Sequence, residues 1–385
     1  MSFQSKTPNF TDSIFTVMGK MALEHDAINL SQGFPNFPSD PVLIALVDQA
    51  MADGYNQYAP MAGDMDLRNA IAHKIEGLHS HRYDPSSEIT LTVGATQAIF
   101  TTIAATIRSG DEVIIFTPAY DCYAPTVELF GGKIVPIQLH PPHFNVNWDT
   151  VANNISEKTK LIIINTPHNP TGMIFSKEDM LQLQDLAVKH NLLVLSDEVY
   201  EHIIFDGEEH QSAARFPELA ARSFITASFG KTFHNTGWKI GYCTAPEFLM
   251  KEFQKVHQFV VFCVNHPTQI ALSTYLKDEE NYLHLADFYQ QKRDLFLNLM
   301  KDSRFKMIPT NGTYFQILDY SAISDSNDIE FSERLLKTHG VATIPTSVFN
   351  VGNQDFKQIR VCFAKTDTML ARATAILKNI SKENF

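Results

Sequence analysis

The residue of greatest chemical interest in this sequence is Lys231, which follows a short apolar run. Residues 223–231 read SFITASFGK and predict a strand that ends in a turn presenting an amine. The carboxyl ends of strands form the ligand crevice of open α/β sheets, and an apolar wall there would desolvate the amine. A desolvated lysine is a nucleophile that can form a Schiff base with a carbonyl group. Lys231 is therefore predicted to do covalent and proton-transfer chemistry.

Polar or conformationally special residues follow four other apolar runs, at residues 89–93, 113–116, 161–164 and 192–195. Runs as continuously apolar as these, separated by helical stretches, are typical of a mostly parallel sheet covered by helices on both faces. The sequence therefore predicts an α/β fold. Its strand ends would gather along one edge Thr96, Tyr120, Asn169, Asp197, Tyr200 and Lys231.

Two further patterns concern the helices and a second, smaller unit. Ser176 opens the string Ser-Lys-Glu-Asp, which resembles a capping box at the start of a helix. A long helical pattern over residues 275–300 leads to apolar runs at 313–318 and 359–363, which predict the strands of a smaller α/β domain. At 385 residues, the chain is long enough for a large domain and a smaller one.

Composition and charge exclude several classes of protein. The net charge of −12 and the lack of a Lys/Arg-rich run argue against a nucleic-acid partner. No apolar run approaches the ~20 residues of a membrane span, and the first residues do not resemble a secretory leader, so we expect a cytoplasmic protein. The four cysteines lie far apart without a Cys-x-x-Cys pair, so we expect neither disulfides nor a metal site.

Taken one at a time, the motifs also have ordinary structural interpretations. Asp197 could cap a helix, Tyr200 could be a core tyrosine, Thr96 could belong to a tight turn and Lys231 could be a solvated lysine. Taken together, their order and spacing resemble the class I, fold-type I pyridoxal-phosphate aminotransferases. The resemblance covers nearly the full chain, from the string NLSQGFP at 29–35 to RVCFA at 360–364.

This resemblance implies a fold-type I architecture. The large domain, at about residues 46–275, would have a mostly parallel seven-stranded sheet between helices, and residues 276–385 would form the small domain. Residues 1–45 would pack on the small domain. Tyr58, in the string NQYAP, matches a tyrosine that reaches the cofactor phosphate of the neighbouring subunit. A homodimer with active sites at the subunit interface follows from that match.

The resemblance also assigns the residues that would bind pyridoxal 5′-phosphate. Lys231 would hold it covalently and later move a proton, and Asp197 would pair with the protonated ring nitrogen. Tyr200 and Asn169 would bond its phenolic oxygen, and Tyr120 would stack on its ring. Its phosphate would lie at a helix N-terminus, bound by Gly94, Ala95, Thr96, Ser228 and Lys239.

Lys239 departs from much of the family, which has arginine at this position. Lysine keeps the charge but loses the bidentate fork. The form Gly-Trp-Lys, at 237–239, is common in the kynurenine aminotransferase branch. The departure therefore indicates a resemblance to that branch within the class.

For the substrate, the resemblance places the α-carboxylate at Arg360, with Asn169 and the backbone of Gly33 beside it. Phe15 and Phe34 are expected near the side chain, and no motif position carries a second arginine. An apolar amino acid is therefore expected: methionine first, as in the similar bacterial methionine aminotransferases, or an aromatic amino acid or kynurenine.

Two alternatives remain open at this stage. A cysteine-conjugate or cystathionine β-lyase would use the same residues to abstract the same proton and then eliminate from Cβ. A non-catalytic regulatory protein could keep the fold without the reaction, since fold does not prove function.

Overall fold

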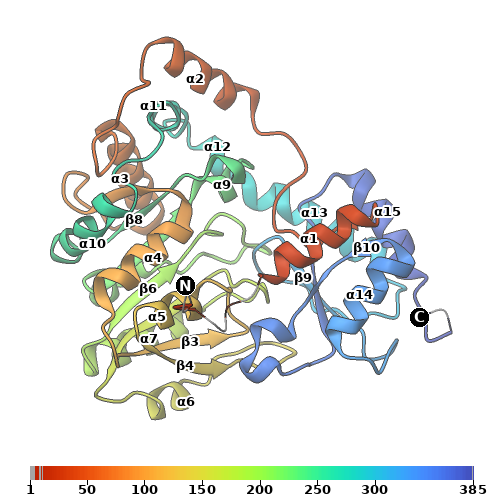
Figure 1. Cartoon of the computed structure of the whole chain (residues 1–385). Coiled ribbons are helices and arrows are strands. Elements are labelled where there is room, and N and C mark those ends of the chain that lie inside the picture. The colour runs from red at the N-terminus through yellow and green to blue at the C-terminus, as the bar shows by residue number, and fades with distance from the viewer. Residues whose placement is uncertain (1–4, 8–9, 11, 384) are drawn as a thin grey trace, which may run out of the picture.

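A seven-stranded sheet forms the centre of the larger part of the molecule in the computed structural model (Figure 1). The structure describes residues 5–7, 10, 12–383 and 385. The expectation about a secretory leader concerned the first residues of the chain, and of these residues 1–4 lie outside the described part. The sheet order is β2-β8-β7-β6-β5-β3-β4, and only β8 runs antiparallel to its neighbours. The strands are β2 (Ile89–Thr92), β3 (Glu112–Thr117), β4 (Lys133–Gln138), β5 (Thr159–Asn165), β6 (Leu193–Asp197), β7 (Ser223–Ser228) and β8 (Gly241–Thr244). The predicted mostly parallel seven-stranded sheet is confirmed.

Alternate side chains of the central strands enter different hydrophobic cores, as the two-residue period of a strand requires. Ile162 and Ile164 of β5 belong to one core, whereas Leu161 and Ile163 belong to the other. Burial on both faces explains why these strands are apolar throughout.

Helices cover both faces of this sheet. In sequence order, the helices of this part are α2 (Pro41–Ala52), α3 (Met65–His79), α4 (Gly94–Thr106), α5 (Tyr123–Leu129), α6 (Trp148–Asn153), α7 (Lys177–Lys189), α8 (Pro217–Ala220), α9 (Phe229–Thr232), α10 (Glu247–Val260) and α11 (His266–Tyr275). The capping box predicted at Ser176 is confirmed: its hydroxyl accepts from the N–H of Asp179, whose carboxylate accepts from the N–H of Ser176.

The smaller part contains two short sheets. An antiparallel sheet has the order β11 (Ile344–Pro345), β12 (Gln358–Cys362), β9 (Phe315–Asp319). In the second sheet, β1 (Ile28–Asn29) pairs in parallel with β10 (Val341–Ala342). Its helices are α1 (Ile14–Glu24), α12 (Glu280–Leu283), α13 (Leu285–Met300), α14 (Asp328–His339) and α15 (Asp367–Lys378).

The helix predicted over 275–300 is shorter than expected. The long helix is α13 and begins at Leu285, because α11 ends at Tyr275 and the one-turn α12 lies between them. An apolar spacing that continues across a turn therefore predicted one helix over a range that holds two, α12 and α13.

The N-terminal segment lies on the smaller part. Met18 and Ala22 of α1 share a core with Leu336, Ala342 and Ile344, and Figure 1 shows α1 beside the C-terminal elements. On the basis of these contacts we propose domain boundaries near residues 45 and 275. In the described residues, no helix is long and apolar enough to cross a membrane.

Candidate active site

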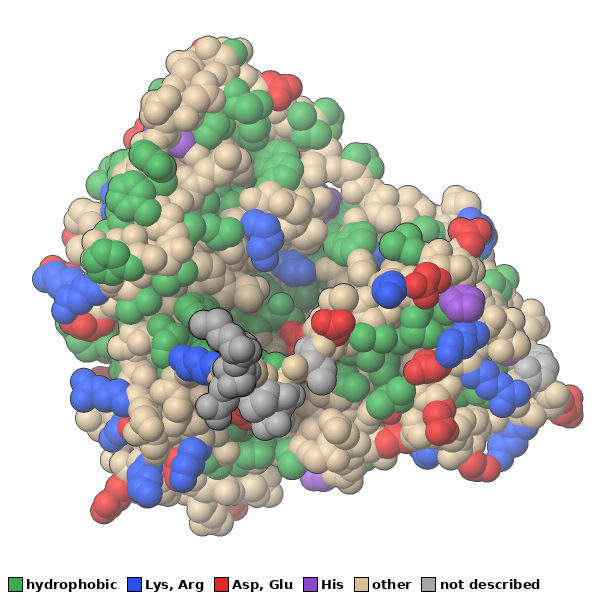
Figure 2. Space-filling view, in the orientation of Figure 1, with side chains coloured by type: hydrophobic (Ala, Val, Ile, Leu, Met, Phe, Trp, Pro, Cys, Tyr) green, Lys and Arg blue, Asp and Glu red, His purple; other side chains and the backbone are tan. Residues whose placement is uncertain are grey.

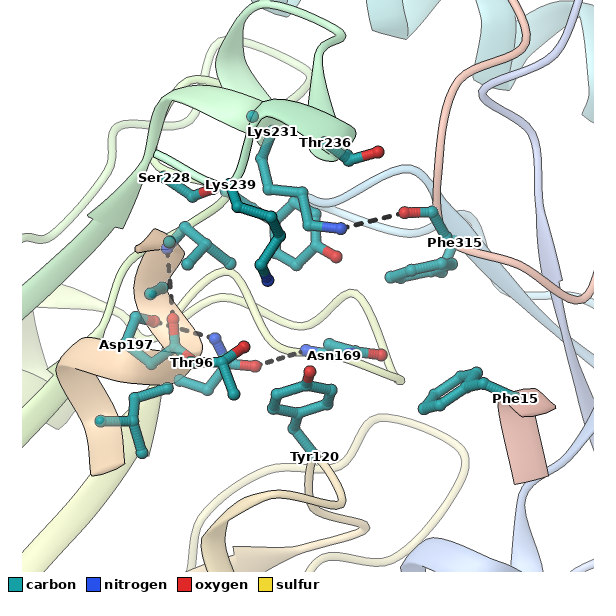
Figure 3. A pocket seen from close by; sticks show the side chains of 18 of the residues that line it. Phe15, Thr96, Tyr120, Asn169, Asp197, Ser228, Lys231, Thr236, Lys239 and Phe315 are labelled. Carbon is teal, nitrogen blue, oxygen red and sulfur yellow. Dashed lines mark hydrogen bonds between the residues drawn. The ribbon is translucent and has the colours of Figure 1, made fainter. Parts of the chain in front are cut away.

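A cavity of about 220 Å³ lies at the carboxyl edge of the seven-stranded sheet, beside β9 and β12. Figure 2 shows a hollow between the two parts of the molecule, and Figure 3 shows the side chains that line the cavity. Side chains from distant parts of the sequence converge there, as predicted for the strand ends. The predicted residues that line it are Phe15, Gly33, Gly94, Ala95, Thr96, Tyr120, Asn169, Asp197, Tyr200, Ser228, Lys231, Lys239 and Arg360.

Lys231 projects into this cavity from α9, the single helical turn that follows β7. Its Nζ donates a hydrogen bond to the carbonyl oxygen of Gly33 at 3.0 Å. Desolvation lowers the pKa of this ammonium to about 8. A substantial fraction of the amine is therefore neutral near pH 8 and can act as a nucleophile or a base.

Asp197 ends β6 and is almost fully buried, with 3% of its surface exposed. Burial raises the pKa of its carboxyl to about 6, although the hydroxyl of Tyr123 donates to it at 2.5 Å. This carboxylate has no salt bridge within the described residues. A cationic group in the cavity would stabilise its charged form.

Asn165, the last residue of β5, connects Asp197 to Asn169. Its amide nitrogen donates to the carbonyl oxygen of Asp197 at 2.8 Å, and its amide oxygen accepts from the backbone N–H of Asn169 at 2.7 Å. Neither Asn165 nor Tyr123 was predicted from the sequence to belong to the site. Asn165 directly follows an apolar run, so its place at the end of a strand could have indicated a site residue. No pattern in the sequence indicates that Tyr123 lies at the site.

The start of α4 and the start of β8 form a narrow cradle for an anion. Gly94 has a φ of +68°, and no described side chain caps the helix that it opens. A Cβ on Gly94 would lie 3.4 Å from Nζ of Lys239, and one on Gly241 would lie 2.5 Å from the carbonyl oxygen of Ala227. An uncapped helix N-terminus next to an ammonium group favours a phosphate. Ser228 lines the same cavity.

Arg360 lies on β12 with only 1% of its surface exposed. Its Nη1 donates to the Asn169 side chain at 2.8 Å, and its Nη2 donates to the carbonyl oxygen of Ser31 at 2.9 Å. The guanidinium carbon lies 3.9 Å from the ring centre of Phe315 and 5.0 Å from that of Phe15.

The charge of Arg360 is not balanced by a carboxylate in direct contact. Burial lowers its pKa, its Nε is buried without a partner, and it forms no salt bridge within the described part of the chain. A buried charge is costly unless it is paired, and a guanidinium binds a planar carboxylate well. Arg360 is therefore chemically suited to bind an anionic ligand group.

Two tyrosines line the cavity. Tyr120 faces Lys231 and Lys239 across it, as Figure 3 shows. Tyr200 is buried beside Tyr314, with ring centres 5.1 Å apart. Burial raises the pKa of both hydroxyls, so both remain protonated donors at neutral pH.

Two predicted site residues do not line the cavity. Tyr58 is 82% exposed, and its ring packs edge-on against Phe262 at 5.5 Å. Phe34 is 42% exposed and covers Lys365 instead. Conversely, Phe315 lines the cavity and stacks on Arg360, a contact that sequence reasoning missed because the residue is one of 28 phenylalanines.

The sequence of this chain is similar to those of known aminotransferases. The family model of class I and II aminotransferases matches residues 25–377. The chain is 47% identical to a methionine aminotransferase of Escherichia coli over 98% of each chain. It is 33% identical to a kynurenine–oxoglutarate transaminase of Dictyostelium discoideum, over 98% of this chain and 96% of that one.

A solved structure is also similar over the whole chain. The crystal structure of an Escherichia coli protein with methionine aminotransferase function superposes with a TM-score of 0.96 at 47% identity, covering 99% of this chain and 100% of that one. The family match, the identity and the common fold lead to one conclusion: this chain belongs to the class I and II aminotransferases.

Proposed function

We propose that this aminotransferase uses pyridoxal 5′-phosphate to move the amino group of an apolar amino acid, methionine first, to a 2-oxo acid. The observation that carries the proposal is the presence, in one cavity, of a lysine of lowered pKa, a buried carboxylate and a buried arginine that forms no salt bridge among the described residues. The lysine suits a carbonyl carbon with which it can form a Schiff base, the carboxylate suits a cationic ring, and the arginine suits an α-carboxylate.

The residues present fit this cofactor. Lys231 would hold it covalently, Asp197 would pair with its ring nitrogen, and Tyr200 and Asn169 would bond its phenolic oxygen. Tyr120, which faces the two lysines, would cover its ring. The cradle at Gly94 suits an anion, since a Cβ on Gly94 would contact Lys239. The donors to the cofactor phosphate would be the backbone of residues 94–96 with Ser228 and Lys239.

When bound, the cofactor stores the amino group between the half-reactions and withdraws electrons from the substrate Cα. The protein binds and orients the substrate and moves the proton. Arg360 and Asn169 bind the α-carboxylate, which fixes the orientation of the Cα–H bond. Once the substrate amino group has taken its place, the amine of Lys231 is free to remove the proton from Cα, and its lowered pKa makes it an effective base near neutral pH.

The lining of the cavity supports an apolar substrate side chain. Phe15 and Phe315 flank Arg360. Among the described residues that line the cavity, the cationic side chains are Lys231, Lys239 and Arg360, and each has a role above. A distal carboxylate would therefore find no free cation in this lining.

We also propose a homodimer in which Tyr58 reaches the partner's cofactor phosphate. The wide exposure of Tyr58 and of Phe259 (86%) supports an interface there. Figure 2 shows hydrophobic side chains on the surface around α2, α10 and α11. The four free cysteines support the proposal of a cytoplasmic location, where thiols remain reduced.

A donor panel tests the proposed substrate class. The purified protein with added cofactor is given a 2-oxo acid and methionine, phenylalanine, kynurenine or aspartate in turn, and oxo-acid products are measured. We expect kcat/KM for methionine to exceed that for aspartate by at least about tenfold, since aspartate would bury an unpaired charge. A preference for aspartate, or release of pyruvate from cystathionine without any acceptor reaction, would contradict the proposal.

A further inference from the structure

Residues 30–36 are fastened to the end of β12 and the segment that follows it. The N–H of Cys362 donates to the carbonyl oxygen of Leu30 at 2.8 Å, and Arg360 donates to that of Ser31 at 2.9 Å. Further along, the N–H of Thr366 donates to the side chain of Asn36 at 2.7 Å. The strand that carries the carboxylate-binding arginine therefore also holds this loop.

Lys365 lies in the middle of this set of contacts. Its Nζ donates to the carbonyl oxygen of Phe34 at 2.8 Å and approaches that of Gln32 at 3.4 Å. The side chain is 98% buried, and across the described residues no carboxylate lies within salt-bridge distance of it. A buried ammonium without a carboxylate depends on its hydrogen bonds, so these carbonyl contacts are needed to hold it.

The two carbonyl groups bonded by Lys365 flank Gly33, which lines the active-site cavity. The carbonyl oxygen of Gly33 accepts from Nζ of Lys231 at 3.0 Å and from the hydroxyl of Tyr314 at 2.6 Å. A Cβ on Gly33 would lie 2.7 Å from the ring of Phe315, which stacks on Arg360. A shift of Gly33 would therefore move it against or away from the Phe315 ring that packs on the Arg360 guanidinium.

We propose that Lys365 is a positioning residue for substrate binding: by bonding the carbonyl groups on either side of Gly33, it sets the loop that completes the α-carboxylate site around Arg360. The inference rests on the proposed function. It predicts that loss of Lys365 weakens reaction with substrates that carry an α-carboxylate and leaves cofactor binding and carboxylate-free amines unaffected.

The test compares Lys365→Met with Lys357→Met in the protein loaded with pyridoxal phosphate. Lys357 is the control, because its Nζ also donates to two backbone carbonyl groups, those of Asp325 and Ser326, both at 2.9 Å. It differs from Lys365 in that it is 35% exposed and lies 3.3 Å from the Asp355 carboxylate. The loss of the cofactor's visible band is followed in single turnovers with methionine and with 3-(methylthio)propylamine, which is methionine without its carboxylate.

We expect Lys365→Met to lower the second-order rate constant for methionine by at least about tenfold, with the amine's rate constant unchanged, because only methionine uses the site around Arg360. Lys357→Met should change neither. Equal losses for methionine and the amine, or no loss for either, would overturn the inference.

A second variant keeps the test decisive if Lys365→Met does not fold. Asn36 is exposed, and Asn36→Ala removes the acceptor for the N–H of Thr366 at the far end of the same loop. It should show the same selective loss for methionine, at about threefold, and an equal effect on both substrates would overturn the inference. If the unsubstituted protein does not react with methionine, the proposed function itself fails, and this inference fails with it.

Discussion

At the scale of single residues, Arg360 is a buried cation that forms no salt bridge among the described residues. Its guanidinium lies over the rings of Phe15 and Phe315, and its Nε has no partner among the residues that the structure describes. Such a group is stabilised when a carboxylate binds, and its planar fork fixes the orientation of that carboxylate. In the proposed function, the orientation of the substrate, and hence the position of the Cα proton relative to Lys231, would depend on Arg360 together with Asn169.

Replacing Arg360 by lysine tests that role. Lysine keeps the charge but cannot bond a carboxylate through two parallel N–H groups. We expect kcat/KM for methionine to fall about 100-fold, with the visible band of the bound cofactor unchanged, because Arg360 does not hold the cofactor. Steady-state kinetics and the absorption spectrum give the two readings. Loss of the cofactor from Arg360→Lys would mean that the residue has been assigned to the wrong group.

Several contacts at this scale could not be predicted from the sequence. Lys231 and Asp197 were predictable, since each ends or follows an apolar strand in a recognisable string. The bond from Tyr123 to Asp197 and the stacking of Phe315 on Arg360 depend on how distant segments meet in three dimensions. Lys365 carries no local signal, because a lysine is normally exposed and only the fold shows that this one is buried.

At the scale of elements, buried polar side chains connect α3 to the segment after β6. Nζ of Lys74 lies 2.6 Å from the Glu201 carboxylate, and both side chains are less than 10% exposed. Burial alone would raise the pKa of Glu201, but Lys74 and His202 lower it, and the net value is about 2. Glu201 directly follows Tyr200, so this pair holds the active-site end of β6 against α3.

Lys74→Met should therefore be strongly destabilising. It leaves the Glu201 carboxylate buried without its partner, which costs about 3–5 kcal/mol in the free energy of unfolding. Urea denaturation measures this loss. The exposed pair of Lys255 and Glu252 supplies the control, and Lys255→Met should cost less than about 1 kcal/mol. Equal effects of the two substitutions would contradict the importance of the buried pair.

His168, in the turn after β5, should make the free energy of unfolding depend on pH. His168 is 2% exposed, and its Nδ1 lies 2.7 Å from the hydroxyl oxygen of Thr171. Burial lowers its pKa from the ordinary 6.5 to about 3. Between these values, the unfolded chain binds a proton that the folded chain does not, so this residue's contribution to stability is lost as the pH falls from about 6.5 towards 3.

His168→Gln should reduce this acid sensitivity. The slope of the unfolding free energy against pH should fall by up to about 1.36 kcal/mol per pH unit in that window, which corresponds to one proton. Urea titrations at a series of pH values between 4 and 7 give the slope. His143→Gln, which removes an exposed histidine, is the matched control. An unchanged slope for His168→Gln would contradict this account.

The elements themselves were predictable to different degrees. Strands such as β5 and β6 are buried on both faces and are therefore continuously apolar, which makes them visible in the sequence. The edge strand β4 contains Pro136, which is tolerated only because one side of that strand is unpaired, and β8 is only four residues long. Neither strand was found from the pattern of residues, and the number seven came from the family resemblance.

At the scale of the whole molecule, the exposed apolar surface near Tyr58 indicates how two chains would associate. Phe259, near the end of α10, is 86% exposed, and Phe262 just beyond it packs against Tyr58. Large apolar side chains at such exposure are typical of an interaction surface. Because Tyr58 lies outside the cavity of its own chain, its proposed role requires the second subunit.

Phe259→Asp should weaken the proposed dimer, since it would bury a charge at the proposed interface. Sedimentation should show the unsubstituted protein at about twice the chain mass of 43.4 kDa and the variant shifted towards a single chain. Leu181→Asp, on α7, is a control for introducing a charge at a partly exposed apolar position and should remain dimeric. A dimeric Phe259→Asp variant with full activity would exclude this surface as the interface.

The measurement that most directly tests the central claim is the visible absorption spectrum of the cofactor-loaded protein, and of Lys231→Ala, before and after methionine is added without a 2-oxo acid. We predict that the band of the unsubstituted protein converts to the pyridoxamine form and that 2-oxo-4-methylthiobutanoate is released in equal amount. Lys231→Ala should stay folded and release at least about 10²-fold less product in the same time. No visible band in the unsubstituted protein, or near-normal product release by Lys231→Ala, would contradict the role assigned to this lysine.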